Sequence, residues 1–160
     1  SGQIAATTVA IPLNYAAEDA GFNVVGRLID AIPEYELGTL AVKKSWAEKN
    51  RPLVVRFMRA LALTHRWIYE NKDAAVDFLA REMQLKPEYA RRGWEYYTRH
   101  QIWHPDADLS VKGTEYAIRI YMEQVGGRGS LTSVAKYIDQ SYLTEALRDL
   151  PKRDNAAPNR

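Results

Sequence analysis

The positions of hydrophobic and polar residues divide the chain into two regions. In residues 3–43, short runs of β-branched and other apolar residues alternate with glycine and proline, a pattern typical of strands joined by turns. The runs are residues 4–9, 22–29 and 37–42. A short helix over residues 14–20 is expected after the first run, because Gly21 follows it and helices often end before glycine. Strand, helix and strand in this order predict an α/β unit.

From Asn50 onward, apolar residues recur every three or four positions, which predicts helices. Five helices are expected, and they start near Asn50, Asn71, Pro87, Ser110 and Asp139. The inward face of the first is predicted to consist of Val54, Phe57, Met58, Leu61, His65 and Ile68, and that of the fourth of Ala117, Tyr121 and Val125. We expect four large side chains of the first helix to be mostly buried, namely Phe57, Leu61, Trp67 and Ile68.

Three short strands at one end of the chain do not make a balanced sheet for five helices. Parallel strands are normally covered on both faces, so partners of the expected sheet are missing from the pattern. We therefore expect this chain to be part of a longer protein. Unpaired strand edges and uncovered apolar helix faces favour association, so a homodimer of the chain alone is also expected.

Composition narrows the classes of protein. Hydrophobic residues make up 46% and charged residues 26%, as in a folded globular domain. The balance of 22 basic and 20 acidic residues leaves a formal net charge of +2, which is too weak to indicate nucleic-acid binding. Arg91, Arg92 and Arg99 lie among aromatic residues, but Glu88 and Glu95 stand at intrahelical pairing distances from them. This segment is interpreted as a solvent-exposed helix face rather than a base-stacking surface.

The stock of metal-binding residues is small. The chain has no cysteine, which excludes disulfides, thiol nucleophiles and cysteine-ligated zinc. His65 falls on the apolar face of a predicted helix and is interpreted as a core or boundary residue. His100 and His104 are four apart, but Pro105 interrupts any helix there and with it the geometry of a metal site. No metal is expected.

Signatures of catalysis are likewise missing from the sequence. The glycines at 126, 127 and 129 have no lysine after them and no strand before them, unlike a phosphate-binding loop, and no Gly-x-Ser-x-Gly motif occurs. Glu34 and Glu36 alternate along an extended segment and would point to opposite sides. We therefore expect a protein that is not an enzyme and carries no cofactor.

An ordered series of short motifs resembles a known family. The motifs are Ser1-Gly2-Gln3-Ile4-Ala5-Ala6, Ile11-Pro12, Ala17-Glu18-Asp19-Ala20-Gly21-Phe22, Ile32-Pro33-Glu34-Tyr35, Trp46-Ala47-Glu48-Lys49-Asn50 and Tyr137-Ile138-Asp139-Gln140-Ser141-Tyr142. Together they resemble solute-binding proteins of nitrate-, sulfonate- and taurine-type ABC importers, which are relatives of thiamine-pyrimidine-precursor binders. Two positions depart from the family pattern: Ala5 stands where the family has aspartate, and Arg51 precedes Pro52.

The resemblance implies a fold and a division of the chain. The fold would be helix-rich α/β, a partial type II periplasmic-binding-protein-like fold. Residues 1–36 would form the end of the second lobe and the hinge, and residues 37–150 the return strand and the C-terminal helices that pack on the first lobe. Residues 151–160 are expected to be a disordered tail, because they are polar and contain two prolines without periodicity.

The resemblance also implies a function. The chain would be the substrate-binding component of an ABC-type importer, periplasmic or lipid-anchored on the outer face of the cytoplasmic membrane. It would capture a small solute, anionic or heteroaromatic, by hinge closure and present it to the permease. Since affinity in that architecture needs both lobes, this chain alone is expected to bind solutes weakly or not at all.

The expected ligand-binding residues form two groups. Thr7, Thr8 and Asn14 lie around the turn after the first strand, and Glu34 and Tyr35 at the hinge return. Two other functions stay open at this point: an enzyme of pyrimidine or thiamine-precursor synthesis on the same fold, and a helical interaction module.

Overall fold

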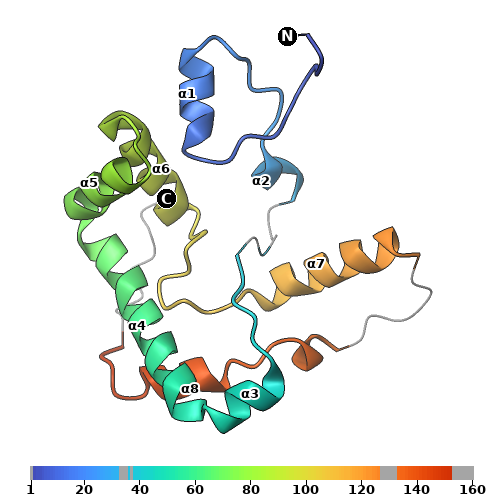
Figure 1. Ribbon diagram of the computed structural model, residues 1–160, viewed down its shortest axis with the longest axis vertical. Coiled ribbons are helices and arrows are strands. Elements are labelled where there is room, and N and C mark those ends of the chain that lie inside the picture. Colours follow the sequence, from blue (N-terminus) through green and yellow to red (C-terminus); the bar gives the residue numbers. More distant parts are fainter. Residues whose placement is uncertain (1, 33–35, 37, 127–132, 153–160) are drawn as a thin grey trace. The chain divides into compact units, whose positions relative to one another are not determined.

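The computed structural model describes residues 2–32, 36, 38–126 and 133–152, and these residues form helices joined by turns and extended segments (Figure 1). The α-helices are α1 (Leu13–Asp19), α2 (Leu28–Ala31), α3 (Lys44–Lys49), α4 (Arg51–Glu70), α5 (Lys72–Glu82), α6 (Pro87–Arg99), α7 (Val111–Gln124) and α8 (Ser141–Leu147). A short 3₁₀ helix, η1 (Val134–Lys136), precedes α8. The described residues contain no β-strand.

The expected α/β fold with a hinge strand is therefore wrong for this structure. Residues 4–9 and 38–42 form no regular structure, and the expected strand over residues 22–29 ends in α2 instead. A strand is stabilised by hydrogen bonds to a neighbouring strand. Within the described part of the chain, no backbone hydrogen bond joins residues 4–9 or 38–42 to another extended segment. Their β-branched residues favour an extended backbone, but without a partner that preference produces no sheet.

The chain divides into two compact units. Unit 1 comprises Ser1–Gly26 and Ile68–Trp103, and unit 2 comprises Arg27–Trp67 and His104–Arg160. In unit 1, α6 packs against both α1 and α5 (Figure 1). The buried apolar residues of this unit are Tyr15, Ala75, Val76, Tyr89 and Ala90. Ala75 and Val76 of α5 and Ala90 of α6 are among them, and their small side chains let the two helices approach closely.

Unit 2 is built around the first seventeen residues of α4. Its buried apolar residues come from α3, α4 and α8, and they are Ala47, Ala62, Tyr142, Leu143 and Ala146. Two ion pairs join α4 to the C-terminal segment: Arg51 lies 2.8 Å from the Glu145 carboxylate, and Arg59 lies 3.2 Å from that of Asp149. Both pairs are solvent-exposed, so each stabilises the unit by less than about 1 kcal/mol.

The signals for helix ends were mostly correct. Pro87 opens α6, and the Ser110 hydroxyl accepts a hydrogen bond of 3.0 Å from the Gly113 N–H at the start of α7. Gly21 follows α1 with a φ of +88°, a conformation that glycine adopts without strain. Asn50 does precede α4, but its side chain donates to the Trp46 carbonyl of α3 and does not cap α4.

The predicted inward faces were correct only in part. On α4, Val54, Met58, Leu61, His65 and Ile68 are half-buried. Phe57 and Trp67 are 52% and 42% exposed, so their expected burial is wrong. On α7, Tyr121 and Val125 are 62% and 55% exposed, which is also contrary to expectation.

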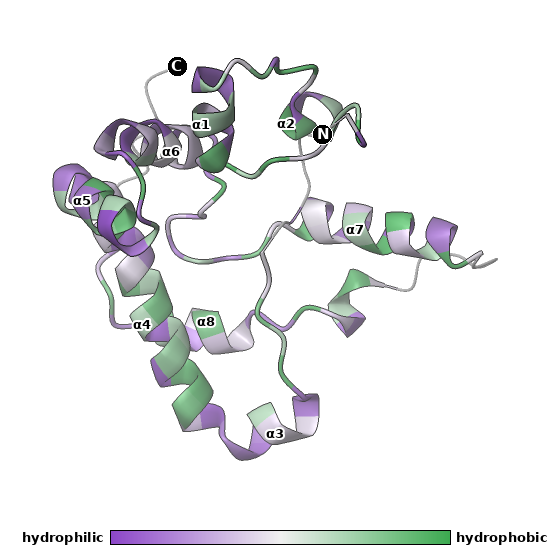
Figure 2. Ribbon diagram, turned by 45° about the horizontal axis from the view of Figure 1, so that its top comes forward, coloured by the Kyte–Doolittle hydropathy of each residue, from purple (hydrophilic) through white to green (hydrophobic). Residues whose placement is uncertain are grey.

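The physical reason for these errors is that apolar periodicity identifies residues that share a helix face without showing what covers that face. Hydrophobic residues recur along several turns of α4 (Figure 2), and Leu53 and Phe57 among them are exposed whereas Leu61 is half-buried. A stripe of large apolar residues can therefore stay exposed while its neighbours are covered.

The expected tail lies largely outside the described residues, because only Pro151 and Lys152 of residues 151–160 are described.

Candidate functional site

Unit 1 contains an apolar pocket of about 220 Å³. Its lining comes from the turn before α1, from α5, from α6 and from the segment after α6. The lining residues are Ile11, Pro12, Leu79, Met83, Ala90, Gly93, Tyr97 and Trp103. None of these side chains carries a formal charge, and the only hydroxyl is that of Tyr97. The pocket therefore suits an apolar or aromatic group better than an ion.

A close approach between α6 and the turn at Ile11–Pro12 forms one wall of the pocket. A Cβ built on Gly93 would lie 2.9 Å from the Cβ of Pro12, which is closer than side-chain atoms normally approach. Glycine at position 93 therefore lets the turn rest directly on the helix. The same contact buries Pro12.

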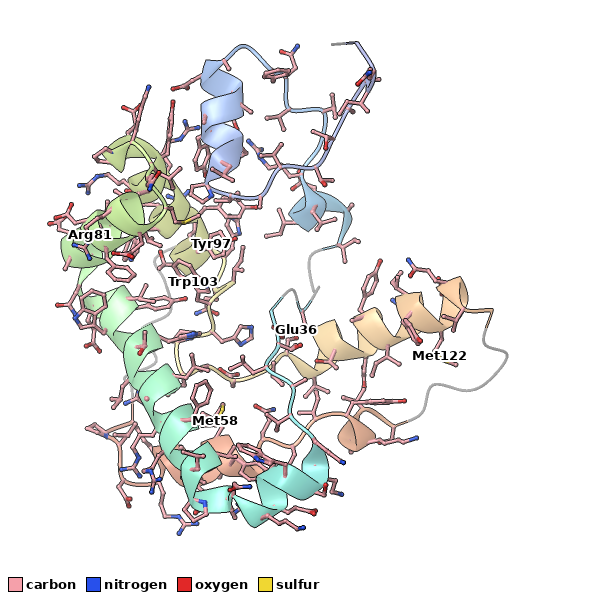
Figure 3. All side chains as sticks on the ribbon, viewed as in Figure 1. Glu36, Met58, Arg81, Tyr97, Trp103 and Met122 are labelled. Atoms are coloured by element: carbon pink, nitrogen blue, oxygen red, sulfur yellow. The ribbon has the colours of Figure 1, made fainter. Side chains whose placement is uncertain are left out.

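Two aromatic rings form another wall. The Tyr97 and Trp103 ring centroids are 4.6 Å apart with an interplanar angle of 43°, and both side chains lie near the C-terminal end of α6 (Figure 3). The Ile102 N–H donates to the Tyr97 carbonyl at 2.9 Å, and the Tyr69 hydroxyl donates to the Trp103 carbonyl at 2.7 Å. These two bonds fix the segment that follows α6 and with it the position of the Trp103 ring.

Burial raises the pKa of Tyr97, so its hydroxyl is protonated throughout the neutral range. Among the residues that the structure describes, none forms a hydrogen bond with this hydroxyl. The pocket lining thus holds one hydroxyl that can act as donor or acceptor, beside the Trp103 indole N–H, which can only donate.

Polar contacts between helices support the pocket from outside. The Trp94 indole N–H donates to the Ile68 carbonyl at 2.8 Å, and Lys72 lies 2.7 Å from the Glu95 carboxylate. The bond to Lys72 lowers the pKa of Glu95. Since Lys72 begins α5 and Glu95 lies in the middle of α6, this pair fixes the two helices that supply most of the lining.

Two arginines of α6 pair with carboxylates on other helices. Arg91 lies 3.4 Å from Asp73 of α5, and Arg92 lies 3.2 Å from Glu18 of α1. The guanidinium of Arg92 also lies 3.8 Å from the Tyr15 ring centroid. These pairs replace the intrahelical ones that the sequence suggested, and they join α6 to its two neighbours.

The structure separates most of the expected ligand-binding residues from the pocket. Thr7 and Thr8 are exposed, and Glu34 and Tyr35 lie outside the described residues. Asn14 lies in the first turn of α1, where its side-chain nitrogen donates to Glu18 at 3.0 Å. The Asn14 Oδ1 is buried and has no hydrogen-bond partner among the described residues. Neither the threonines nor Asn14 lines the pocket.

The expected position of the site was nevertheless close in sequence to the observed pocket. Ile11 and Pro12 lie between Thr8 and Asn14, and both line it. The residues expected to bind ligand are the polar ones around this turn, whereas its apolar ones line the pocket. The density of aromatic residues between 94 and 103 was a usable signal, but helical periodicity assigned those residues to the core.

Unit 2 has a broader hollow of about 460 Å³. Its lining residues are Val111, Glu115, Ser133, Val134, Ala135, Ile138 and Gln140. More than half of them are exposed, so a solute there would stay largely hydrated. The Gln140 side-chain oxygen already accepts from the Leu109 N–H. This hollow is therefore the weaker candidate.

A polar cluster surrounds His104, also in unit 2. His65 Nδ1 donates to the His104 carbonyl at 2.7 Å, since a carbonyl can only accept. The His104 ring lies 3.4 Å from the Asp108 carboxylate, and this ion pair raises the pKa of His104 and lowers that of Asp108. Arg66, whose side chain is 11% exposed, lies 2.7 Å from Asp106. The contacts hold the segment between α6 and α7 against α4.

The histidines considered as metal ligands are engaged elsewhere. The His100 ring lies against the Tyr96 ring at 4.4 Å, while His104 pairs with Asp108. In the described ranges, no three histidine or carboxylate side chains form a group that could hold a metal ion. A search of the same ranges finds no helix with the length and apolar character needed to span a membrane.

Comparison with models of protein families finds no match to this chain, and neither curated proteins nor solved structures give a significant one. The resemblance in the ordered motifs therefore stays a prediction from the sequence.

Proposed function

We propose that this chain is the substrate-binding part of an ABC-type importer, and that the pocket of unit 1 holds the apolar portion of the solute. One observation carries the proposal: the Ile11–Pro12 turn lines a pocket that is otherwise bounded by apolar and aromatic side chains. The resemblance in sequence assigns the same turn to the ligand cleft of solute-binding proteins. On this proposal the protein acts in the periplasm, or anchored by lipid on the outer face of the cytoplasmic membrane, and passes its solute to a permease.

The size of the pocket limits what binds. Small-molecule sites usually measure about 300–1,000 Å³, whereas a dry apolar cavity of about 150 Å³ suffices for benzene. A pocket of about 220 Å³ therefore suits a single ring. Removing about 120–160 Å² of apolar ring surface from water gains about 3–4 kcal/mol, which corresponds to a dissociation constant in the millimolar range. Weak binding of this kind agrees with the expectation for the chain alone.

The pocket chemistry supports binding over turnover. Its lining offers no carboxylate, imidazole, amine or aliphatic hydroxyl that could act as acid, base or nucleophile. The Tyr97 hydroxyl is the one titratable group there, and burial moves its pKa away from neutrality. A solute held by these side chains would leave unchanged, as transport requires.

A matched pair of variants on α5 tests the proposal. A mixed panel of charged and uncharged solutes is screened by ligand-detected NMR against the wild type, Met83→Trp and Phe78→Trp. Met83 lines the pocket and is 45% exposed, so tryptophan there would block the opening without burying a larger side chain in the core. Phe78 is 50% exposed on the same helix and does not line the pocket.

We expect at least one solute to bind the wild type and Phe78→Trp, to lose most of its affinity for Met83→Trp, and to be recovered chemically unchanged. Equal binding to all three proteins would show that the pocket is not the site. Conversion of the solute would favour an enzyme over a transport receptor.

A helical interaction module is the second candidate, and the surface of α4 favours it. Leu53, Phe57, Leu63 and Trp67 are each between 42% and 52% exposed. Large apolar side chains that share a helix and remain exposed commonly mark a protein contact surface. Pull-down of a stoichiometric protein partner that Phe57→Glu abolishes, combined with no solute binding, would favour this candidate.

A further inference from the structure

We infer that the pocket of unit 1 selects an uncharged, planar aromatic ring that carries one hydrogen-bonding substituent. This inference rests on the proposed function and assigns its solute class. It also chooses between the anionic and heteroaromatic solutes that the sequence left open.

The absence of charge in the lining argues against an anionic group. All eight lining residues are neutral, and seven of them have no hydroxyl, amide or carboxyl group in a side chain. A sulfonate or carboxylate placed among them would lose its hydration without gaining a cation. Lys72 and Arg92 of the same unit already pair with Glu95 and Glu18, outside the pocket. An anion would therefore bind more weakly than a neutral ring of the same size.

The shape of the lining favours a planar ring. Tyr97 and Trp103 present two rings tilted by 43°, and a third ring can stack on one and meet the edge of the other. Met83 and Leu79 of α5 also line the pocket. Methionine sulfur makes favourable contacts with aromatic rings, and its flexible side chain adapts to their outline. A branched aliphatic solute of equal volume would forgo both kinds of contact.

The Tyr97 hydroxyl gives the pocket a preference for rings that carry a hydrogen-bonding substituent. The Tyr97 hydroxyl has no hydrogen-bond partner among the described residues, although the side chain is half-buried. A hydroxyl, amine or ring nitrogen on the solute can bond to it. Sites built around such a group discriminate against analogues that lack the matching substituent, because the protein group is then left unpaired.

The three methionines of the chain allow a direct test. Met83 lines the pocket, whereas Met58 and Met122 belong to unit 2. The protein labelled with ¹³C at the methionine methyls gives one reporter in the pocket and two internal references. It is titrated separately with benzyl alcohol, toluene and benzenesulfonate. We expect benzyl alcohol to shift the Met83 resonance with a dissociation constant in the millimolar range, and benzenesulfonate to bind at least about tenfold more weakly.

The variant Tyr97→Phe tests the polar group while keeping the ring. We expect it to weaken benzyl alcohol several-fold and to leave toluene unchanged. A Met83 resonance that toluene still shifts would show that unit 1 of the variant is folded, since Met58 and Met122 report only on unit 2. Equal weakening of both ligands would overturn the assigned role of the hydroxyl.

Two further outcomes would reject the assigned solute class without rejecting the proposed function. If benzenesulfonate shifts Met83 as strongly as benzyl alcohol, the assignment to neutral rings is wrong and the proposed function stands. The same holds if all three rings fail while another solute of the panel shifts Met83. Failure of every solute to shift Met83 would overturn the proposed function together with the solute class.

Discussion

Gly93 and Pro12 are in contact so close that a side chain at position 93 would overlap the proline. The Cβ built on Gly93 lies 2.9 Å from Pro12 Cβ and 3.8 Å from the Ile11 Cγ2. A turn near the start of the chain thus rests on a helix about eighty residues later, and the pocket lies beside this contact. The motif that suggested a ligand cleft in the sequence therefore contains two of the residues that line the pocket.

This contact predicts a large effect for a small substitution. Gly93→Ala forces α6 and the turn apart, and overpacking of this kind costs about 1–3 kcal/mol of unfolding free energy. The gain in helix propensity, about 1 kcal/mol, offsets part of that cost. We therefore expect a net loss of up to about 2 kcal/mol in urea unfolding.

Gly26→Ala is the matched control, because an added Cβ there has no atom within 4 Å. We expect it to change stability by less than about 0.5 kcal/mol. A stabilised Gly93→Ala protein that binds solutes normally would contradict the packing at this position.

The exposure of α4 predicts a contrast between two apolar residues of unit 2. Leu143 is 5% exposed and Phe57 is 52% exposed. Leu143→Ala should cost about 2–5 kcal/mol, the usual range for a buried leucine. Phe57→Ala should cost about 1 kcal/mol, because roughly half of its side chain is already in water. A loss of 3 kcal/mol or more for Phe57→Ala in urea unfolding would show that another part of the chain covers this face.

The helices were predictable from the sequence because their causes are local. Pro87, Ser110 and Gly21 fix helix ends through backbone geometry and a nearby hydrogen bond, and each acts within a few residues. Buried faces are harder to predict, since Phe57 and Leu61 belong to one apolar pattern and only contacts distant in sequence decide which of them is covered.

The expected sheet failed for a related reason. Residues 4–9 and 38–42 have the composition of strands, but a strand also needs a partner, and partner choice is not encoded in a local pattern. The candidate site shows the same limit. Thr7, Thr8 and Asn14 were chosen for their polarity near a turn, whereas Met83 and Trp103 reach the pocket only through tertiary packing.

The ion pair of His104 and Asp108 predicts a window of pH dependence. Pairing raises the pKa of His104, so this stabilisation is complete below about pH 6.5, the ordinary value in unfolded chains, and is lost as the pH rises through the folded-state pKa. Pairing lowers the pKa of Asp108, so the stabilisation is complete above about pH 4 and is lost as the pH falls through the folded-state pKa. The contribution is therefore largest between about pH 4 and 6.5.

The variant Asp108→Asn measures this contribution. The two side chains are 31% and 51% exposed, so solvent screening limits the pair to less than about 1 kcal/mol. NMR titration should show the pKa of His104 falling in the variant, because burial lowers it and only the weaker influence of Glu36 still raises it. An unchanged His104 titration would mean that the pair does not form in solution.

Exposed apolar residues in the extended segments predict self-association. Phe22, Val25 and Leu40 are 71%, 89% and 63% exposed, and they lie in segments that were expected to form strands. Such segments can pair between copies of the chain. Light scattering should show a mass that rises with concentration above that of the 18.2 kDa monomer, and Val25→Lys should reduce the effect. A monomer of constant mass over a wide concentration range would contradict this expectation.

The central claim is that the pocket between Ile11–Pro12, α5 and α6 binds a ring-bearing solute. Intermolecular nuclear Overhauser effects between the ring protons of benzyl alcohol and the methionine methyls of the full chain test it most directly. The account predicts effects at Met83, which lines the pocket, and none at Met58 or Met122. Effects at Met58 or Met122 without any at Met83 would place the ligand elsewhere and contradict the claim.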